Sequence, residues 1–365
     1  MTSTTPKIVF FGTGVIGGSV AGWVAPHHDN LYVIDQGATA AALKEKGITL
    51  YQGDRPEDKV NVRVKVLDGI EQAADADIIV LGVKNYSLER VARMLRDKTD
   101  GHAVILSMAN GIVNQEILPK YFSRVLYCVV SYNAWMDAPG VIGFQKKGPL
   151  ILGTPDNSLL EELALAAGIF NRGVETVVTP HLQDAVHCKI IINLTNSVTT
   201  LVGHRFREIS DPTAFQRILT NLLYEGMKIV QAAGYHECKL GGMPSWALLR
   251  LSVTLPRLIT KSLFERNVKK MVLSSMAQDV LQRHGKDTEL ETINGYIVSL
   301  ADKLGMKAPY NRTIYALCKR EFSRDEFTPL DVKDVWAHCC PNVFTATYHR
   351  LLFYSPLRPL CDLSI

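Results

Sequence analysis

The sequence has no uninterrupted apolar run of the roughly 18 residues that a membrane-spanning helix needs. Residues 1–6 also lack the basic start and the hydrophobic stretch of a secretory leader. The net charge is only +4 on 365 residues, and charges of both signs are spread along the chain. So mild a balance argues against a nucleic-acid partner. These absences predict a soluble, cytoplasmic protein with no membrane and no nucleic-acid partner.

The seven cysteines lack a pattern as well. An odd number without CxxC spacing argues against a disulfide framework and against a zinc site. His338, Cys339 and Cys340 are consecutive, but no second ligand pair accompanies them at a recognisable spacing. We therefore predict no metal and interpret the cysteines as buried thiols in a reducing compartment.

The length of the chain exceeds one typical domain and predicts two, each with a core of its own. Residues 1–180 alternate short apolar runs with helical patterns, which is typical of a doubly wound parallel sheet. The runs that predict its strands lie at residues 62–66, 78–83, 103–107, 125–130 and 174–178. Residues 141–144 and 150–153 are expected to form a hairpin, and the Ser-x-x-Glu pattern of residues 158–161 predicts a capping box that opens a helix.

From residue 181 the pattern changes, and residues 181–327 predict an all-α domain. Its long amphipathic stretches are residues 184–200, 214–233 and 288–304. The C-terminal extension of residues 328–365 is apolar enough that we expect it to pack on the helical domain. The fold class is therefore α/β, with an N-terminal Rossmann-type sheet followed by helices.

The most informative motif lies near the N-terminus, where a β-rich run leads into Gly12-Thr13-Gly14-Val15-Ile16-Gly17. In such a turn the first glycine allows a tight bend, the second lets the backbone approach a pyrophosphate, and the third permits close packing of helix on strand. The phosphates lie at the N-terminus of the following helix. A second apolar run, residues 31–34, ends at Asp35, where this fold places the acid that binds a ribose. The spacing predicts that residues 12–17 and Asp35 bind a dinucleotide.

Lys189, Asn193 and Asn196 form a polar stripe in an otherwise apolar helix. Their spacing of i, i+4 and i+7 places them on one face. Because an unpaired buried polar group costs about 1–3 kcal/mol, such a stripe is expected to line a cavity between the domains. Alternatively, Lys189 extends to solvent and the asparagines bond to the backbone. Periodicity does not distinguish the two interpretations.

Several separated motifs, taken in order, resemble the ketopantoate reductase (2-dehydropantoate 2-reductase) family. The resemblance extends to about residue 325 and is carried by the turn at residues 12–17, Val83-Lys84-Asn85-Tyr86, Asn110-Gly111, Lys189 with Asn193, Ser274-Ser275-Met276-x-x-Asp279, and residues 288–295. It implies that the first domain holds a nicotinamide cofactor, NADH or NADPH. It further implies that the helical domain closes over a small 2-keto acid.

The resemblance also implies roles for single residues. Lys189 matches the family's catalytic lysine, the general acid and electrostatic partner of the carbonyl oxygen, and partial burial is expected to lower its pKa. Glu289 matches an acidic residue near the reacting centre, which could orient Lys189 or bind a substrate hydroxyl. Asn193 and Ser275 would bind the substrate, Ser275 through its carboxylate, and Asn110 would contact the nicotinamide end or the substrate. Without the resemblance, Ser275 and Glu289 are interpreted as helix caps.

The chain departs from the family pattern after the second predicted strand. An arginine that pairs with the 2′-phosphate of NADP is common there, whereas this sequence has Asp35 followed by Gln36 and Gly37. An acid favours the free 2′-hydroxyl of NAD, although Lys84 could still serve a 2′-phosphate. Val272 replaces an expected polar residue, and residues 241–264 and 328–365 are additional. The particular 2-keto acid therefore stays open.

We predict an NAD(P)H-dependent reduction of a 2-keto acid to a 2-hydroxy acid, with ketopantoate as the family's usual substrate. One alternative is an NAD-dependent D-2-hydroxyacid dehydrogenase that acts on bulkier 2-keto acids. Another is a non-catalytic dinucleotide-binding redox sensor, which would need the glycines but no proton donor. A homodimer is the expectation for the assembly, from family habit and the apolar tail.

Overall fold

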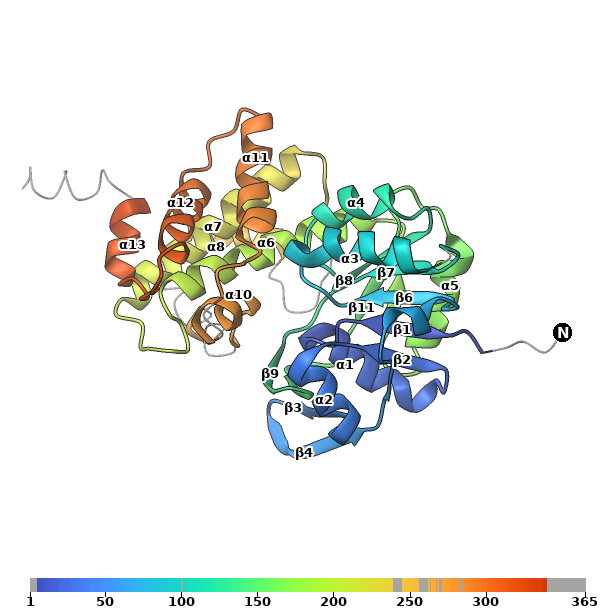
Figure 1. Ribbon diagram of the computed structural model, residues 1–365. Helices are drawn as coiled ribbons and strands as arrows, with labels where there is room; N and C mark the ends of the chain where they lie inside the picture. The colour runs from blue at the N-terminus through green and yellow to red at the C-terminus, as the bar shows by residue number, and fades with distance from the viewer. Residues whose placement is uncertain are drawn as a thin grey trace, which may run out of the picture.

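The computed structural model describes residues 5–99, 101–238, 245–255, 262, 264–266, 268, 271–282 and 285–339. Its first domain is built on an eight-stranded sheet with the order β12-β11-β8-β7-β6-β1-β2-β5 (Figure 1). The strands are β1 (Ile8–Phe11), β2 (Leu31–Ile34), β5 (Lys65–Val66), β6 (Ile78–Leu81), β7 (Val104–Ser107), β8 (Val125–Val130), β11 (Leu150–Gly153) and β12 (Thr176–Val178). All neighbouring strands are parallel except β8 and β11. The predicted strands at residues 78–83, 103–107, 125–130 and 174–178 are confirmed.

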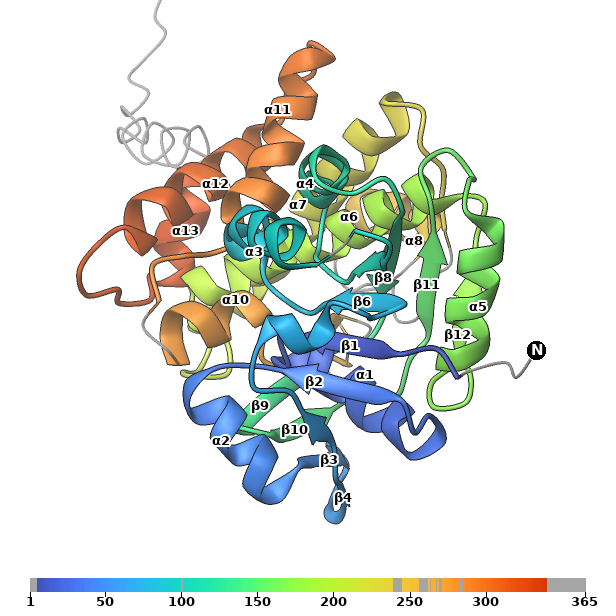
Figure 2. The same ribbon diagram turned by 45° about the vertical axis from the view of Figure 1, so that its right-hand side comes forward.

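Helices cover both faces of this sheet (Figure 2). They are α1 (Val15–Val24), α2 (Gly37–Lys46), α3 (Asn85–Lys98), α4 (Val113–Ile117) and α5 (Leu160–Phe170), with short 3-10 turns at Ala25–His27, Ile70–Ala73 and Leu118–Lys120. Alternate residues of β1 belong to different cores: Phe10 packs in the core that includes α1 and α5, and Val9 in the core that includes α3. A parallel sheet covered in this way needs strands that are apolar on both faces, which explains their Val- and Ile-rich sequences.

A second, four-stranded sheet was not predicted. Its order is β4-β3-β10-β9, formed by β3 (Ile48–Gln52), β4 (Arg55–Val62), β9 (Ala134–Ala138) and β10 (Val141–Phe144). The hairpin predicted from residues 141–144 and 150–153 is therefore wrong, because β10 pairs with β9 and β3 while β11 pairs with β8 and β12. The turn that joins β9 to β10 is made by Gly140, whose φ of +75° favours glycine.

Two smaller predictions also need correction. The run at residues 62–66 is not one strand, since β4 ends at Val62 and β5 begins at Lys65. The capping box at residues 158–161 is wrong as well. The hydroxyl of Ser158 donates to Asp156 at 2.7 Å, and α5 is preceded by Leu159, whose φ is +56°. The side chain of Ser158 is thus used in the loop rather than at the helix.

The second domain is helical, as predicted. It contains α6 (Leu182–Leu201), α7 (Pro212–Ala232), α8 (Trp246–Thr254), α10 (Ser275–Ala277), α11 (Tyr296–Lys303), α12 (Pro309–Phe322) and α13 (Val332–Cys339), with π-helical turns η4 (Gln278–Gln282) and η5 (Glu291–Gly295). Asp211 caps α7 by accepting from the N–H groups of Thr213 and Ala214. Among the described residues no helix is long and apolar enough to cross a bilayer.

Helix α6 lies at the junction of the two domains (Figure 1). It packs against α7, α10, α12 and η5 of the helical domain and also against β8 and β11 of the sheet. Its residues Ile190 and Leu194 continue the core that covers one face of the sheet. Helix α13 packs on α7 and α12, whereas residues 340–365 of the predicted extension, Cys340 among them, lie outside the described residues.

Candidate active site

The glycine turn has the backbone that its sequence predicts. Gly12 has φ +89°, and a Cβ there would lie 2.9 Å from Cγ1 of Val83. A Cβ on Gly17 would overlap the carbonyl oxygen of Gly12, so α1 can lie this close to β1 only without a side chain. Gly14 differs, because a Cβ there would meet no atom within 4 Å. Gly14 also precedes α1 without any side-chain cap, so the helix presents its first N–H groups beside an open space.

Asp35 lies at the carboxyl end of β2 and faces this turn. Its Oδ2 accepts from the backbone N–H and the hydroxyl of Thr13, both at 2.6 Å. Its Oδ1 accepts from the N–H of Gln36 at 2.8 Å. These three donors fix the carboxylate against the loop and leave lone pairs for a further donor such as a ribose hydroxyl. Val15 and Ile16 follow in the first turn of α1.

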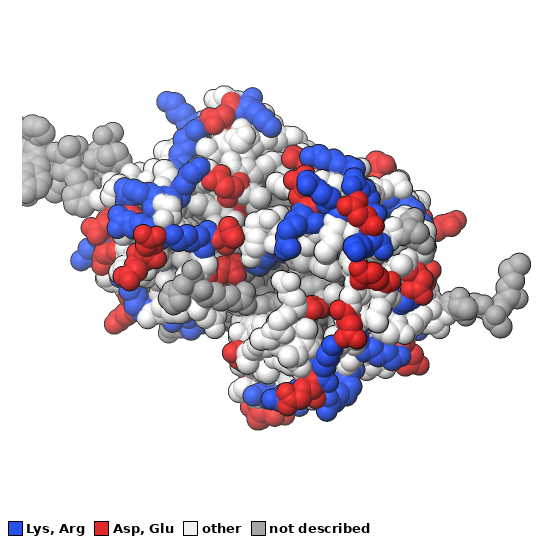
Figure 3. Space-filling view, in the orientation of Figure 1, with Lys and Arg blue, Asp and Glu red and all other residues white. Residues whose placement is uncertain are grey.

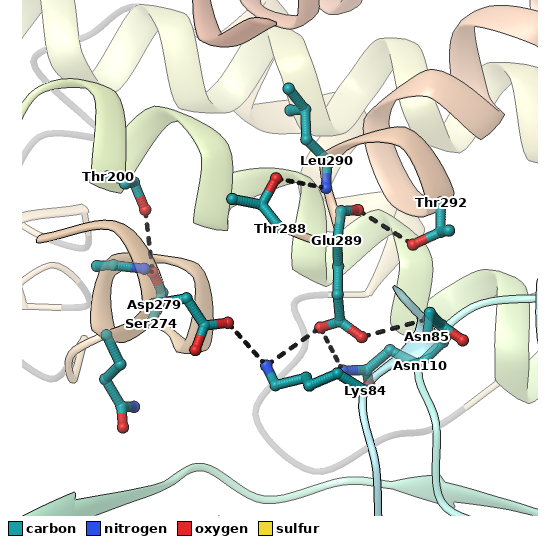
Figure 4. A network of polar contacts seen from close by, with 12 residues as sticks. Lys84, Asn85, Asn110, Thr200, Ser274, Asp279, Thr288, Glu289, Leu290 and Thr292 are labelled. Carbon is teal, nitrogen blue, oxygen red and sulfur yellow. Dashed lines mark hydrogen bonds and ion pairs between the residues drawn. The ribbon is translucent and has the colours of Figure 1, made fainter. Parts of the chain in front are cut away.

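A network of polar contacts joins the two domains (Figure 4). Lys84, directly before α3, places its Nζ 3.1 Å from Oδ2 of Asp279 and 3.6 Å from Oε2 of Glu289. The carboxylate of Glu289 also accepts from the side-chain amides of Asn85 and Asn110, each at 3.2 Å. Asn85 donates in addition to the backbone oxygen of Asn110 at 2.6 Å. Glu289 is buried, and Lys84, Asn85 and Asn110, which contact its carboxylate, all belong to the first domain.

Lys189 lies in a small pocket at the carboxyl ends of β7 and β8, which it lines together with Asn110, Asn114 and Tyr127. Burial lowers the pKa of Lys189 to about 8, and the charge of Glu289 opposes this shift. Lys84 behaves differently, because burial also disfavours its charge but Glu289 and Asp279 raise its pKa overall. Lys189 can therefore exchange a proton near neutral pH, whereas Lys84 stays charged.

The structure places two of the predicted site residues, Lys189 and Asn110, in this pocket. Of the predicted polar stripe, Lys189 lines this pocket, whereas Asn193 and Asn196 are not among its lining residues. Asn193 is buried one turn further along α6. Ser275 begins α10, which packs on α6.

The interpretation of Ser275 and Glu289 as helix caps is wrong. Ser274 caps α10, since its hydroxyl accepts from the N–H of Ala277 at 3.1 Å. The carboxylate of Glu289 is directed across the domain boundary, toward Lys84 and Asn85. Neither side chain is therefore used as a helix cap.

Sequence reasoning gave no role to Asn85 or Asp279, although both stand in motifs that resemble the family. Asn85 and Glu289 are 204 positions apart, and Lys84 and Asp279 are 195 apart. Contacts over such separations have no local pattern. The only available signal was that these polar residues stand beside Lys84 and Ser275 in the matched motifs.

Comparisons with known proteins agree with this geometry. A family model described as "Ketopantoate reductase PanE/ApbA" matches residues 8–157, and its companion, described as "Ketopantoate reductase PanE/ApbA C terminal", matches residues 181–321. The protein is thus a two-domain oxidoreductase of the nicotinamide-dependent class. The chain belongs to the ketopantoate reductase family.

Individual relatives are distant but cover most of the chain. A 2-dehydropantoate 2-reductase from Pyrococcus abyssi is 25% identical over 315 residues, which is 86% of this chain and 97% of the relative. The crystal structure of a PanE/ApbA family ketopantoate reductase from Ralstonia eutropha JMP134 has a TM-score of 0.69 at 22% identity, over 87% of this chain and 99% of that one. D-mandelate dehydrogenase, in a ternary structure with NADH and anilino(oxo)acetate, has a TM-score of 0.70 at 18% identity, over 87% of this chain and 98% of that one. At these identities the two structures establish the shared fold.

Proposed function

We propose that this protein reduces a 2-keto acid to a 2-hydroxy acid with a nicotinamide cofactor, and that ketopantoate is the first substrate to test. Residues 1–180 would bind the cofactor and residues 181–327 the substrate. The observation that carries the proposal is the position of Lys189, whose pKa is lowered to about 8 in a pocket that it lines with Asn110. Membership of the ketopantoate reductase family supports the same conclusion.

The residues of the glycine turn fit a dinucleotide. The open space at Gly14 and the uncapped start of α1 suit a pyrophosphate, which backbone N–H groups of residues 14–16 would bind. Asp35 would accept from the adenosine ribose, while Thr13 holds its carboxylate in place. Asn110, at the end of β7, would contact the nicotinamide end or the substrate. When bound, the cofactor supplies the hydride for the reaction.

The side chains of the pocket meet the needs of a carbonyl reduction. Hydride addition to C2 turns the ketone oxygen into an alkoxide, which takes one proton to give the alcohol. Lys189 would donate that proton, and its charge would stabilise the oxyanion as it forms. Glu289 would orient Lys189 or bind a substrate hydroxyl. Ser275 would bind the substrate carboxylate, and Asn193 would donate to the substrate.

Three observations support NADH over NADPH. The carboxylate of Asp35 is fixed where a 2′-phosphate would bring further negative charge. The first turn of α2, which follows directly, contains no basic residue. Lys84 follows β6, which is separated from β2 by β1, so the ends of the two strands lie roughly 10 Å apart. Its Nζ contacts Asp279 and Glu289 of the other domain instead.

We expect Asp35→Ala to lower the ratio of kcat/KM with NADH to kcat/KM with NADPH by roughly 10-fold or more, the effect of losing one charge-assisted hydrogen bond. Steady-state rates with both cofactors measure it. Asp29→Ala, at an exposed acid just before β2, is the matched control and should leave the ratio unchanged. A wild-type enzyme that prefers NADPH would contradict the assignment of Asp35.

The pH dependence of the reaction follows from Lys189. Reduction needs the protonated amine, so kcat is expected to be constant below pH 8 and to fall above it, because the pKa of Lys189 is about 8. Oxidation of the 2-hydroxy acid needs the neutral amine, so its kcat should rise through the same range. Rate profiles in both directions check this. If neither limb titrates between about pH 7 and 9, Lys189 is not the group that exchanges the proton.

Oxidation of NADH and NADPH by ketopantoate, benzoylformate and branched-chain 2-keto acids tests the proposed function. Turnover of ketopantoate supports the first choice of substrate, whereas turnover of the bulkier acids alone would support a D-2-hydroxyacid dehydrogenase. Tight cofactor binding with no turnover of any of them would favour the sensor. Lys and Arg are interspersed with Asp and Glu on the face in Figure 3, which fits a small-molecule partner. A homodimer and a cytoplasmic location stay predictions.

A further inference from the structure

Lys84 is a lysine of the first domain whose contacts are with two carboxylates of the second. Its Nζ lies 3.1 Å from Asp279 and 3.6 Å from Glu289 (Figure 4). Both acids are almost fully buried, at 7% and 4% exposed, while the side chain of Lys84 is 31% exposed. Two buried carboxylates so close to one cation would repel each other strongly without it.

Glu289 is also the charged residue that acts on Lys189. Its negative charge raises the pKa of Lys189 against the larger effect of burial. The same carboxylate lies 3.6 Å from Lys84 and accepts from Asn85 and Asn110. Glu289 therefore interacts with two lysines: it pairs with Lys84 across the domain boundary, and its charge acts on Lys189 of its own domain.

We propose that Lys84 is a positioning residue of the reaction: it fixes the carboxylate of Glu289 between the domains and weakens the field of that carboxylate at Lys189. The inference rests on the proposed function. Asn85 and Asn110 assist by holding Glu289 from the same side. Asp279 competes with Glu289 for the ammonium group of Lys84, and so it limits how strongly Lys84 offsets the charge of Glu289.

The other titratable groups packed around α6 are directed elsewhere or stay neutral. His187 bonds to the hydroxyl of Tyr296, and burial lowers its pKa. Glu225 of α7 accepts from Asn311 at the start of α12. Burial raises the pKa of Cys318 on α12, whose thiol bonds to the backbone of Ser197.

The titratable groups of β8, and Tyr86 close to Lys84, are uncharged around pH 8. Burial raises the pKa of Tyr127 well above its ordinary value and that of Cys128 to about 12. The pKa of Tyr86 is raised by burial and by Asp279. Lys84, Asp279 and Glu289 are therefore the charges that we expect to control Lys189.

These contacts predict the direction in which each substitution shifts the titration midpoint of Lys189. Lys84→Met removes the positive charge and leaves the charge of Glu289 uncompensated. The titration midpoint of Lys189 should therefore rise by roughly one pH unit, which is the low end of the pKa shifts caused by a single nearby charge. Asp279→Asn leaves Lys84 to Glu289 alone and should shift the midpoint downward. Lys84→Arg keeps the charge and should leave the midpoint within a few tenths of the wild-type value, which is the matched control.

Competitive acetylation of the whole enzyme with a trace of acetic anhydride, followed by peptide mass spectrometry across a pH series, measures the midpoint of Lys189 directly. Opposite shifts for Lys84→Met and Asp279→Asn would support the proposal. An unchanged midpoint in both variants, or shifts of the same sign, would overturn it. Asp279→Asn is isosteric and keeps the test decisive if Lys84→Met fails to fold.

This labelling needs neither cofactor nor substrate, so it separates two failures. Opposite shifts without turnover of any 2-keto acid would leave the effect of Lys84 on Lys189 standing and reject the proposed function. Turnover of a 2-keto acid with no shift of the midpoint would support the proposed function and reject the effect of Lys84 on Lys189. In the active enzyme, the pH limb of kcat should move with the labelling midpoint, which a merely structural role of Lys84 would not cause.

Discussion

Replacing Lys189 with alanine is expected to lower kcat for 2-keto acid reduction by about 10²–10⁴, the range typical for the loss of a general acid. The physical reason is that hydride addition would create an alkoxide beside Lys189, and no other cationic side chain lines the pocket of Lys189 among the described residues. Lys84, the lysine across the boundary, is paired with Asp279 and Glu289 and has a raised pKa, so it makes a poor proton donor near neutral pH.

The affinity for the dinucleotide should be almost unchanged in Lys189→Ala, because the glycine turn and Asp35 lie on the other domain. Fluorescence titration with the reduced cofactor measures this. Lys303→Ala, which removes an exposed lysine at the end of α11, is the matched control and should retain full activity. Near-normal turnover by Lys189→Ala would remove Lys189 from the mechanism.

Gly14→Ala is expected to weaken dinucleotide binding by roughly 10- to 100-fold with almost no change in folding stability. A methyl group at Gly14 meets no protein atom within 4 Å, and the φ of −60° suits alanine. That methyl group would instead occupy the space where the pyrophosphate approaches the backbone. Losing hydrogen bonds to a charged group costs about 1.5–3 kcal/mol, which gives the expected factor.

Gly17→Ala should behave in the opposite way. Its Cβ would overlap the carbonyl oxygen of Gly12, which is backbone and cannot rotate aside. Overpacking of this kind costs about 1–3 kcal/mol, so Tm should fall by several degrees, at roughly 2–4 °C per kcal/mol. Calorimetry and isothermal titration of both variants make the comparison. Equal loss of stability in Gly14→Ala and Gly17→Ala would contradict the distinct roles of the two glycines.

The elements that the sequence predicted well are those whose pattern is local. The central strands are buried on both faces, so their uninterrupted Val and Ile runs identify them, and α7 has a clear amphipathic repeat. Strand β4 (Arg55–Val62) is an exposed edge with charged residues, and its sequence gives no apolar signal. The second sheet was therefore missed, and with it the correct partners of β10.

The site was predictable in its members but not in its contacts. Spacing and family resemblance together indicated Lys189, Asn110 and Glu289. They could not indicate that Lys84 pairs with Asp279, because the pair depends on how two domains pack. For the same reason the sequence left Lys84 with a role at the 2′-phosphate, whereas its contacts are with two carboxylates.

The transfer of deuterium from reduced cofactor to substrate tests the central claim most directly. The enzyme would be incubated with NADH carrying deuterium at C4 of the nicotinamide, on either face, and with ketopantoate or the best 2-keto acid of the panel, and the product analysed by NMR. We expect deuterium at C2 of the 2-hydroxy acid from one face only, with the product forming much more slowly in Lys189→Ala. Cofactor binding without any deuterium at C2, from either face and with every 2-keto acid tried, would contradict the account.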